Sequence, residues 1–144
     1  LKGAHLGTNR GTPWMKKEGT SNVVLEFEGG RLAYHFGTWG ARGTRLGYSI
    51  QAHCTEGLLE ANFARHQLML HQEGQQRVLL ETEAGKQTEN EMRHFLECIK
   101  TGRKPLTDGP GSLQGLRVIW RLYEAERNNT TADLRGLGLD EFQE

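Results

Sequence analysis

Two runs of alternating apolar and polar residues, 21–28 and 31–37, are joined by Gly29–Gly30. A period of two places successive side chains on opposite faces of an extended strand. A glycine pair between two such runs is typical of a tight hairpin turn. The alternation therefore predicts a β-hairpin in this part of the chain.

The alternation resumes further along the chain and predicts two more strand pairs. One pair is formed by the runs around residues 48–54 and 58–63, with a turn at Thr55–Gly57. The other pair surrounds a turn at Glu73–Gly74. Short alternating runs with turn residues between them indicate a mostly antiparallel sheet.

The hydrophobic period then changes from that of a strand to that of a helix. Apolar residues at spacings of three and four predict a helix over 88–101, where Thr88 and Glu91 form a capping box and Gly102 occupies the C-cap position. A second helix follows, capped by Asp108 or Ser112. The predicted fold class is α+β: an open, mostly antiparallel mixed β-sheet with two C-terminal helices packed on one face.

The alternation also divides the sheet into two sets of side chains. We expect one set to point toward the helices: Leu32, Tyr34, Phe36, Ile50, Ala52, Leu59, Ala61, Leu68 and Leu70. The opposite set mixes polar and apolar residues: His35, Trp39, Gln51, His53, Leu58, Glu60, Met69 and His71. Such a face favours a partner or ligand surface. Its three histidines suggest a metal site, but solvated or interface histidines are the favoured interpretation, since nothing fixes the strand register.

Composition narrows the possible partners. The 144 residues contain 18 basic and 18 acidic side chains, and this balance argues against a nucleic-acid or membrane-surface protein. No apolar run is long enough to span a membrane and no signal peptide is recognisable, so a cytoplasmic location is expected. Cys54 and Cys98 are far apart and indicate neither a disulfide framework nor a zinc site. The first residue, Leu1, suggests that the chain is part of a longer protein.

The segment 36–47, FGTWGARGTRLG, is rich in glycine and arginine and could bind a phosphate. It lacks the lysine of a P-loop, and it lies between strands rather than before a helix as a dinucleotide-binding turn must. Two interpretations remain: a flexible connection between strands, or a loop at the mouth of a ligand site. In the second, Trp39 supplies a flat surface and Arg42 or Arg45 supplies a cation. No nucleophile motif such as G-x-S-x-G occurs.

The segment 90–129 resembles the C-terminal end of the glucose-fructose oxidoreductase, inositol dehydrogenase and MocA family, written Gfo/Idh/MocA. The family's helix reads E-x-x-x-F-x-x-x-I-x-x-G-x-x-P, which is matched here by Glu91, Phe95, Ile99, Gly102 and Pro105. The hairpin VVLEFEGGRLAYHFG is similar to the family's strand pair that ends in F-x-x-G. On this resemblance residues 1–134 form the family's C-terminal substrate and oligomerisation domain, and residues 135–144 form a tail.

The resemblance implies a parent enzyme with an N-terminal Rossmann domain, which this chain lacks. The parent would be an NAD(P)-dependent oxidoreductase acting on a sugar, cyclitol or related polyol, with NAD or NADP bound by the Rossmann domain. The family's catalytic histidine and Glu-Lys-Pro lysine are expected upstream, because His5 and Lys104 do not match their positions. No catalytic, cofactor-binding or metal-binding residue is therefore assigned in this chain.

Within that parent, this chain is expected to bind substrate and to assemble. Trp39 would stack on the sugar and Arg42 would donate hydrogen bonds to it. The free face of the sheet would make a homodimer or a higher homo-oligomer, and the isolated fragment is expected to be inactive. The alternative is a non-catalytic binding or assembly module that uses the same open sheet face.

Overall fold

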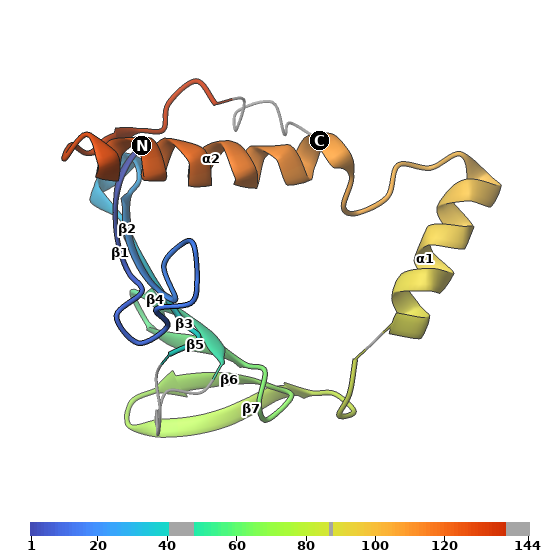
Figure 1. The fold of residues 1–144 in the computed structure, drawn as a ribbon. Coiled ribbons are helices and arrows are strands. Elements are labelled where there is room, and N and C mark those ends of the chain that lie inside the picture. Colours follow the sequence, from blue (N-terminus) through green and yellow to red (C-terminus); the bar gives the residue numbers. More distant parts are fainter. Residues whose placement is uncertain (41–47, 87, 138–144) are drawn as a thin grey trace. The chain divides into compact units, whose positions relative to one another are not determined.

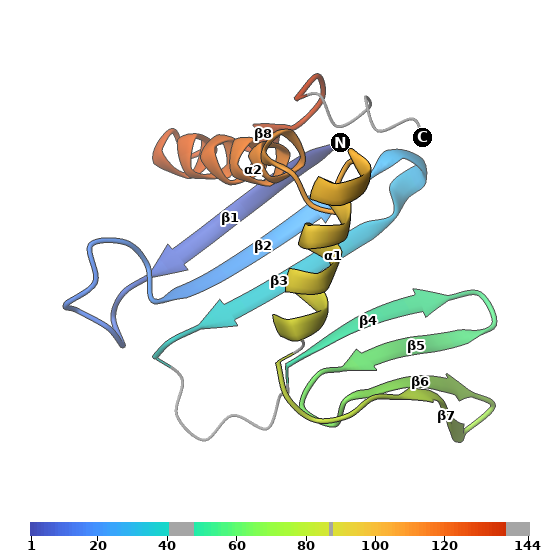
Figure 2. The same ribbon diagram turned by 90° about the vertical axis from the view of Figure 1, so that its right-hand side faces the viewer.

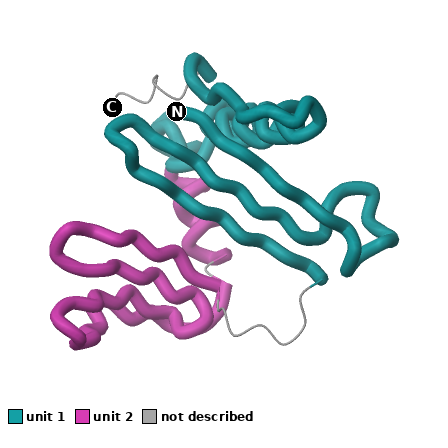
Figure 3. Tube along the Cα trace, turned by 90° about the vertical axis from the view of Figure 1, so that its left-hand side faces the viewer, with its two compact units in different colours: residues 1–42, 98–144 teal, residues 43–97 magenta. Residues whose placement is uncertain are grey.

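The computed structural model describes residues 1–40, 48–86 and 88–137 (Figure 1). The chain divides into two compact units, and Figure 3 colours them separately. Unit 1 comprises Leu1–Arg42 and Cys98–Glu144, and unit 2 comprises Gly43–Glu97. The predicted α+β class with open antiparallel strands is confirmed, and the strands form two four-stranded sheets rather than one. Alternation predicts each hairpin, but it carries no information on pairing across the long connection 39–48.

Unit 1 contains one four-stranded sheet in the order β3-β2-β1-β8 (Figure 2). Its strands are β1 (Lys2–Thr8), β2 (Thr20–Glu26), β3 (Leu32–Thr38) and the short β8 (Ala132–Asp133). All neighbouring strands are antiparallel. The β1–β2 connection, residues 9–19, is longer than the β2–β3 turn and forms the loop described below.

The predicted hairpin at Gly29–Gly30 is confirmed as the β2–β3 pair. Its turn is a short 3-10 segment, Glu28–Gly30, and both glycines have positive φ angles of 75° and 77°. Only glycine adopts that backbone region without a steric penalty. The glycine pair therefore closes this hairpin for a conformational reason.

Unit 2 contains four strands that follow one another in sequence order (Figure 2). They are β4 (Ser49–Cys54), β5 (Gly57–Asn62), β6 (Gln67–Gln72) and β7 (Gln75–Glu81). Each strand pairs antiparallel with the next, and a register shift at Leu68/Met69 interrupts the β6–β7 ladder. The two predicted strand pairs, β4–β5 and β6–β7, are confirmed, and the β5–β6 pairing joins them into a meander.

Both predicted helices are present. Helix α1 spans Thr88–Thr101, and helix α2 spans Gly109–Arg127. The N-cap of α2 is Asp108, whose Oδ1 accepts a hydrogen bond of 2.8 Å from the backbone N–H of Gly111. A carboxylate there satisfies a backbone donor that has no partner within the helix. This observation decides between the two predicted caps.

The core of unit 1 lies between α2 and the sheet. Four residues are buried together: Leu122, Ala125, Ala132 and Leu134. Val23 and Leu25 of β2 pack against them. A Cβ atom placed on Gly3 would lie only 3.0 Å from Leu122 Cδ2, so the glycine allows close packing of α2 on β1. In α1 only Cys98 is buried, and the predicted apolar stripe of that helix is exposed: Met92, Phe95, Leu96 and Ile99.

The expected orientation of β3 is wrong. Val23 packs toward α2, and its cross-strand partner is His35, so His35 lies on the helix-covered face. Leu32, Tyr34 and Phe36 lie on the opposite face and are exposed. Alternation separates the two faces of a strand, but it does not say which one a helix covers.

The expected division of the unit 2 strands into two faces is confirmed by the strand register. The register places Gln51, Glu60 and Met69 in one row across three strands. The adjacent row contains His53, Leu58 and His71. Cross-strand partners share a face, so these polar and apolar residues form one surface, on which Met69 is buried.

Candidate functional site

The β1–β2 loop, residues 9–19, is fixed to the end of β3 by backbone hydrogen bonds. The N–H of Gly19 donates to Thr8 O at 3.0 Å, and the N–H of Trp39 donates to Gly19 O at 2.7 Å. Within the loop, Thr12 N donates to Asn9 O at 2.8 Å. These bonds give the segment that carries Trp39 a defined position at one end of the sheet in unit 1.

A buried threonine packs this loop against two glycines. Thr12 is 1% exposed. A Cβ on Gly19 would lie 1.7 Å from Thr12 Oγ1, and one on Gly40 would lie 3.2 Å from Thr12 Cγ2. Position 19 therefore requires glycine because there is no room for a side chain. The Thr12 hydroxyl has no hydrogen-bond partner among the described residues.

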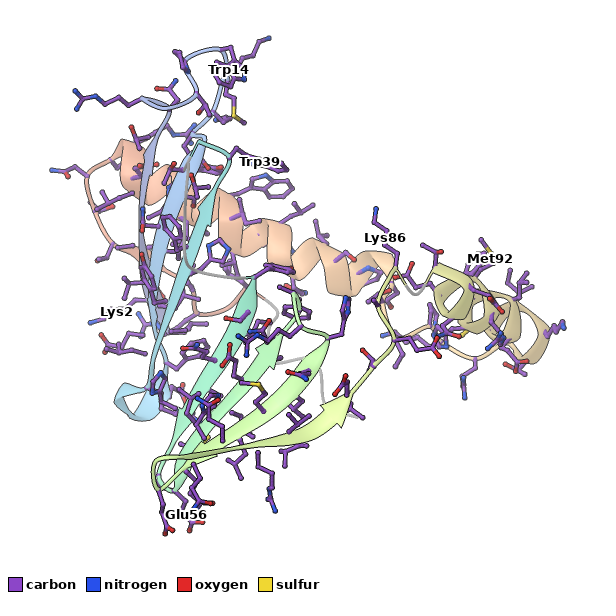
Figure 4. The ribbon with its side chains drawn as sticks, turned by 90° about the horizontal axis from the view of Figure 1, so that it is seen from below. Lys2, Trp14, Trp39, Glu56, Lys86 and Met92 are labelled. Atoms are coloured by element: carbon purple, nitrogen blue, oxygen red, sulfur yellow. The ribbon has the colours of Figure 1, made fainter. Side chains whose placement is uncertain are left out.

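Two tryptophans project from this end of unit 1 (Figure 4). Trp39 is 85% exposed and Trp14, in the β1–β2 loop, is 76% exposed. A flat indole on a fixed backbone is a suitable stacking surface for a ring-shaped ligand. Arg42, the other predicted substrate-binding residue, and Arg45 lie outside the described residues. Sequence reasoning singled out Trp39 but missed Trp14, which belongs to no alternating run.

A partly buried polar network lies on the helix-covered face of the same sheet. His5 of β1 is 6% exposed. Its Nδ1–H donates to Glu126 Oε2 of α2 at 2.8 Å, and its Nε2 is hydrogen-bonded to Ser21 Oγ of β2 at 2.9 Å. The other carboxylate oxygen of Glu126 accepts the backbone N–H of Gly7 at 2.8 Å. One histidine therefore connects three elements that are far apart in sequence.

Tyr123 and Glu18 extend this network. The Tyr123 hydroxyl donates a short hydrogen bond to Glu18, whose Oε1 lies 3.8 Å from His5 Nε2. The bond to Glu18, together with burial, raises the pKa of Tyr123 to about 12, because ionising the phenol would place two negative charges side by side. The ring of Tyr123 also meets His5 edge to face, with centroids 5.1 Å apart. The phenol therefore stays neutral and acts as a donor.

The pKa of Glu126 is lowered. Burial by itself raises it, but the hydrogen bonds from Gly7 and His5 and the nearby charge of Lys17 have the larger combined effect.

The order Ser21, His5, Glu126 has the connectivity of a serine nucleophile, a base and an orienting acid. Because the imidazole is buried and both ring nitrogens are engaged, it offers no atom to a substrate. The network holds the end of α2 against β1.

Residue spacing in the sequence contains a signal for this network. Gly3, His5 and Gly7 alternate along β1 on the face toward α2, and Glu126 lies four residues after Leu122 on α2. Spacings of two and four place these residues on the packed faces of a strand and a helix. A histidine and a glutamate in those positions predict a buried pair.

Unit 2 carries a smaller polar pair. His71 Nε2–H donates to Glu60 Oε2 at 3.0 Å, and Asn62 Nδ2 donates to Glu60 Oε1 at 3.0 Å. Among the described residues, no group of three or more histidine, cysteine, aspartate or glutamate side chains could hold a metal ion. The three histidines of the predicted face are also divided, since His35 belongs to unit 1.

Neither of the described helices is both long enough and apolar enough to cross a membrane.

Comparison of the sequence with models of known protein families finds no match, and comparison with curated proteins finds none either. Similarity is found only with solved structures.

The chain is similar in fold to an aldose-aldose oxidoreductase from Caulobacter crescentus complexed with glycerol. The TM-score is 0.74 and the identity is 22%, over 92% of this chain and 41% of that chain. It is also similar to an oxidoreductase from Agrobacterium radiobacter in complex with NAD+, L-tartaric acid and magnesium, with a TM-score of 0.69 and 15% identity over 92% of this chain and 43% of that chain. The chain therefore spans about two fifths of these structures. The fold therefore agrees with the predicted resemblance to one part of an oxidoreductase.

Proposed function

We propose that this chain is the substrate-binding and oligomerisation part of an NAD(P)-dependent oxidoreductase that acts on a sugar, cyclitol or related polyol. The observation that carries the proposal is the fold match, which extends over 92% of the chain and stops at 41% of the aldose-aldose oxidoreductase. The missing part of such a parent would contain the nucleotide-binding domain. Hydride transfer between a substrate carbon and the nicotinamide would take place there.

The ligands of the similar structures agree with this substrate class. One was solved with glycerol and the other with NAD+ and L-tartaric acid, and glycerol and tartaric acid are small hydroxylated molecules. In this chain, Trp39 would contribute a stacking surface and Arg42 hydrogen bonds to such a substrate. Support for Trp39 comes from its exposed indole and from the bond that fixes its backbone to Gly19.

The proposed assembly surface is the face of the unit 1 sheet that faces away from α2, here called the open face. Its exposed apolar residues are Leu6, Val24, Leu32, Tyr34 and Phe36. The strand register places Leu6 and Phe36 on either side of Asn22, and Val24 beside Tyr34. A largely apolar exposed surface of this kind is typical of a protein interface.

A light-scattering measurement tests the assembly role. A single copy of the chain has a mass of 16.2 kDa. In solution the measured mass is expected to be twice this value. Tyr34→Lys should convert it to the single-copy mass, because a charge would be buried in the interface. Leu106→Lys is the matched control, since Leu106 is exposed outside the open face. A wild-type chain of single-copy mass would contradict this role.

A kinetic measurement on the parent tests the catalytic role. The coding region upstream of Leu1 should encode a G-x-G-x-x-G turn between a strand and a helix. In that longer protein, Trp39→Ala should raise the KM for a sugar about tenfold, in line with the loss of a stacking contact. Trp120→Ala removes an exposed indole of α2 and serves as the control. Unchanged kinetic constants in Trp39→Ala would show that the loop is only a connection.

A second function is a non-catalytic binding or assembly module that uses the open face. It is favoured by the apolar character of that face and by the closed His5 network, which offers no reactive atom. Both proposals predict oligomers. An upstream region without a nucleotide-binding turn, together with assembly through Tyr34, would favour the module.

A further inference from the structure

A groove of about 370 Å³ in unit 1 lies between the β1–β2 loop and the last turn of α2, on the helix-covered side of the sheet. Its charged lining residues are Lys16, Lys17, Glu18, Glu126 and Arg127. It is distinct from the open face, and the proposed function gives it no role. Three cations and two carboxylates give its lining a formal excess of one positive charge.

The two carboxylates of the groove are already compensated by the protein. Glu18 accepts the hydroxyl of Tyr123, and Glu126 accepts hydrogen bonds of 2.8 Å from both Gly7 and His5. Lys17 lies 5.0 Å from the centroid of the Tyr123 ring. Its charge also acts on Glu126. Each carboxylate therefore already has hydrogen-bond donors within the protein, and Lys17 offsets part of their negative charge.

Two cations on opposite walls remain available. Lys16 of the loop and Arg127 of α2 are exposed, and neither makes an ion pair within the described part of the chain. Arg127 lies at the C-terminal end of α2, where a cation is favoured by the helix dipole. The dipole explains a cation at that end, but it does not explain Lys16 across the groove. A guanidinium also matches the planar geometry of a carboxylate or a phosphate group.

We infer that this groove binds a small anion that also carries hydroxyl groups, such as a sugar acid or a sugar phosphate. The anionic group lies between Lys16 and Arg127. The hydroxyl groups donate to the remaining lone pairs of Glu18 and Glu126, because a carboxylate oxygen accepts more than one hydrogen bond. The mixture of cations and fixed acceptors selects a hydroxylated anion over a neutral sugar.

The test is a titration of the isotopically labelled 144-residue chain, followed by amide chemical shifts at constant ionic strength. The probes are gluconate, glucose 6-phosphate, inorganic phosphate and glucose. Gluconate or glucose 6-phosphate is expected to give saturable shifts at residues 7–9, 16–18 and 126–127, and glucose is expected to give none. Saturation by gluconate alone identifies a carboxylate ligand, and saturation by glucose 6-phosphate alone identifies a phosphate ligand.

Arg127→Gln and Lys16→Gln should each weaken binding about tenfold, the effect of removing one charged partner. Lys100→Gln is the matched control, because Lys100 is also a cation in the last turn of a helix. Absence of saturable shifts with gluconate and glucose 6-phosphate would overturn the inference, as would equal affinity in Arg127→Gln and the wild type. Inorganic phosphate binding as tightly as glucose 6-phosphate would overturn the role of the hydroxyl groups. The readout is binding to this chain and does not depend on oxidoreductase activity.

Discussion

The two units contain sheets of equal strand number, but within the described residues extensive helix packing is found on the sheet of unit 1 and not on that of unit 2. In unit 1, α2 covers β1 and β8, and four hydrophobic residues are buried together. In unit 2, Met69 is the one buried hydrophobic residue among the described positions, and Ile50, Val78 and Leu80 are exposed. A sheet of amphipathic strands gains a core only when a second layer covers one face. Equal strand patterns therefore produce unequal cores.

The polar interactions of the two units differ in the same way. In unit 1, His5 and Glu126 are 121 residues apart and join a strand to a helix. In unit 2, Glu60 and His71 are 11 residues apart and join neighbouring strands. The first pair fixes tertiary structure, whereas the second only supports a strand pairing that the hairpin already sets. Substitutions in the core and polar network of unit 1 should therefore cost more stability than comparable substitutions in unit 2.

Leu122→Ala should lower the free energy of unfolding of unit 1 by about 3 kcal/mol, because it leaves a cavity under α2. Ile50→Ala in unit 2 is the control and should cost less than about 1 kcal/mol, since Ile50 is exposed. Denaturant unfolding, monitored through hydrogen exchange of the β1 and β5 amides, measures the loss of unfolding free energy in both variants. Equal losses in the two variants would refute the difference between the cores.

Gly19→Ala should destabilise unit 1 by about 1–3 kcal/mol, because its Cβ would overlap with Thr12. Gly115→Ala is the matched control. It lies within α2 with no heavy atom near its Cβ position, and it should stabilise by about 0.5–1 kcal/mol through helix propensity. Thermal unfolding of the two variants should therefore move in opposite directions. A shift of the same sign in both would contradict the packed loop.

Glu126→Gln should cost about 1–2 kcal/mol at neutral pH, because it weakens charge-assisted hydrogen bonds in a partly exposed network. The pKa of Glu126 is lowered, so its stabilisation is present above its ordinary pKa of 4.5 and declines as the pH falls below that value. Stability measured between pH 7 and pH 3 should thus fall less steeply in Glu126→Gln than in the wild type. Parallel pH profiles would contradict the assignment.

Tyr123→Phe should change the alkaline limb of the stability curve. The pKa of Tyr123 is raised from 10.0 to about 12, so the unfolded chain ionises first. The stabilisation from the phenol is therefore complete below pH 10 and is lost as the pH rises toward 12. Tyr34→Phe, on the open face, is the control. The wild type should lose more stability than Tyr123→Phe between pH 9 and pH 11, as measured by urea unfolding.

His71→Gln should have the smallest effect, about 0.2–1 kcal/mol, because it removes one cross-strand pair in unit 2. The pair is partly exposed, and the β5–β6 hairpin bonds remain in place. Hydrogen exchange of β5 and β6 amides measures the change against His53→Gln, which lies on the same face. A loss of unfolding free energy as large as that of Glu126→Gln would show that unit 2 also depends on its polar interactions.

Much of the local structure follows from the sequence. The Gly29–Gly30 hairpin, the strand pairs of unit 2 and the two helices are all predicted from periodicity and caps. The alternation places Gln51, Glu60 and Met69 on one face, and the register confirms it. These features are decided by residues that are close in sequence, so a local pattern is sufficient.

The candidate site is less accessible to such reasoning. Trp39 was identified from its residue type, but its backbone bond to Gly19 and the packing of Thr12 under the loop depend on a contact between distant segments. The orientation of β3 was predicted wrongly because its more apolar face is the open face. Hydrophobicity alone does not distinguish a core face from an interface face.

The sequence by itself determined three strand pairs and two helices of this protein, with glycines at the turns. Only the tertiary structure decided which face of β1 and β2 is covered, and it alone brought His5 to Glu126 and placed Lys16 and Arg127 in the lining of one groove. The physical reason is that periodicity fixes the relative direction of neighbouring side chains. The partner of each face is set by long-range packing, which no local pattern encodes.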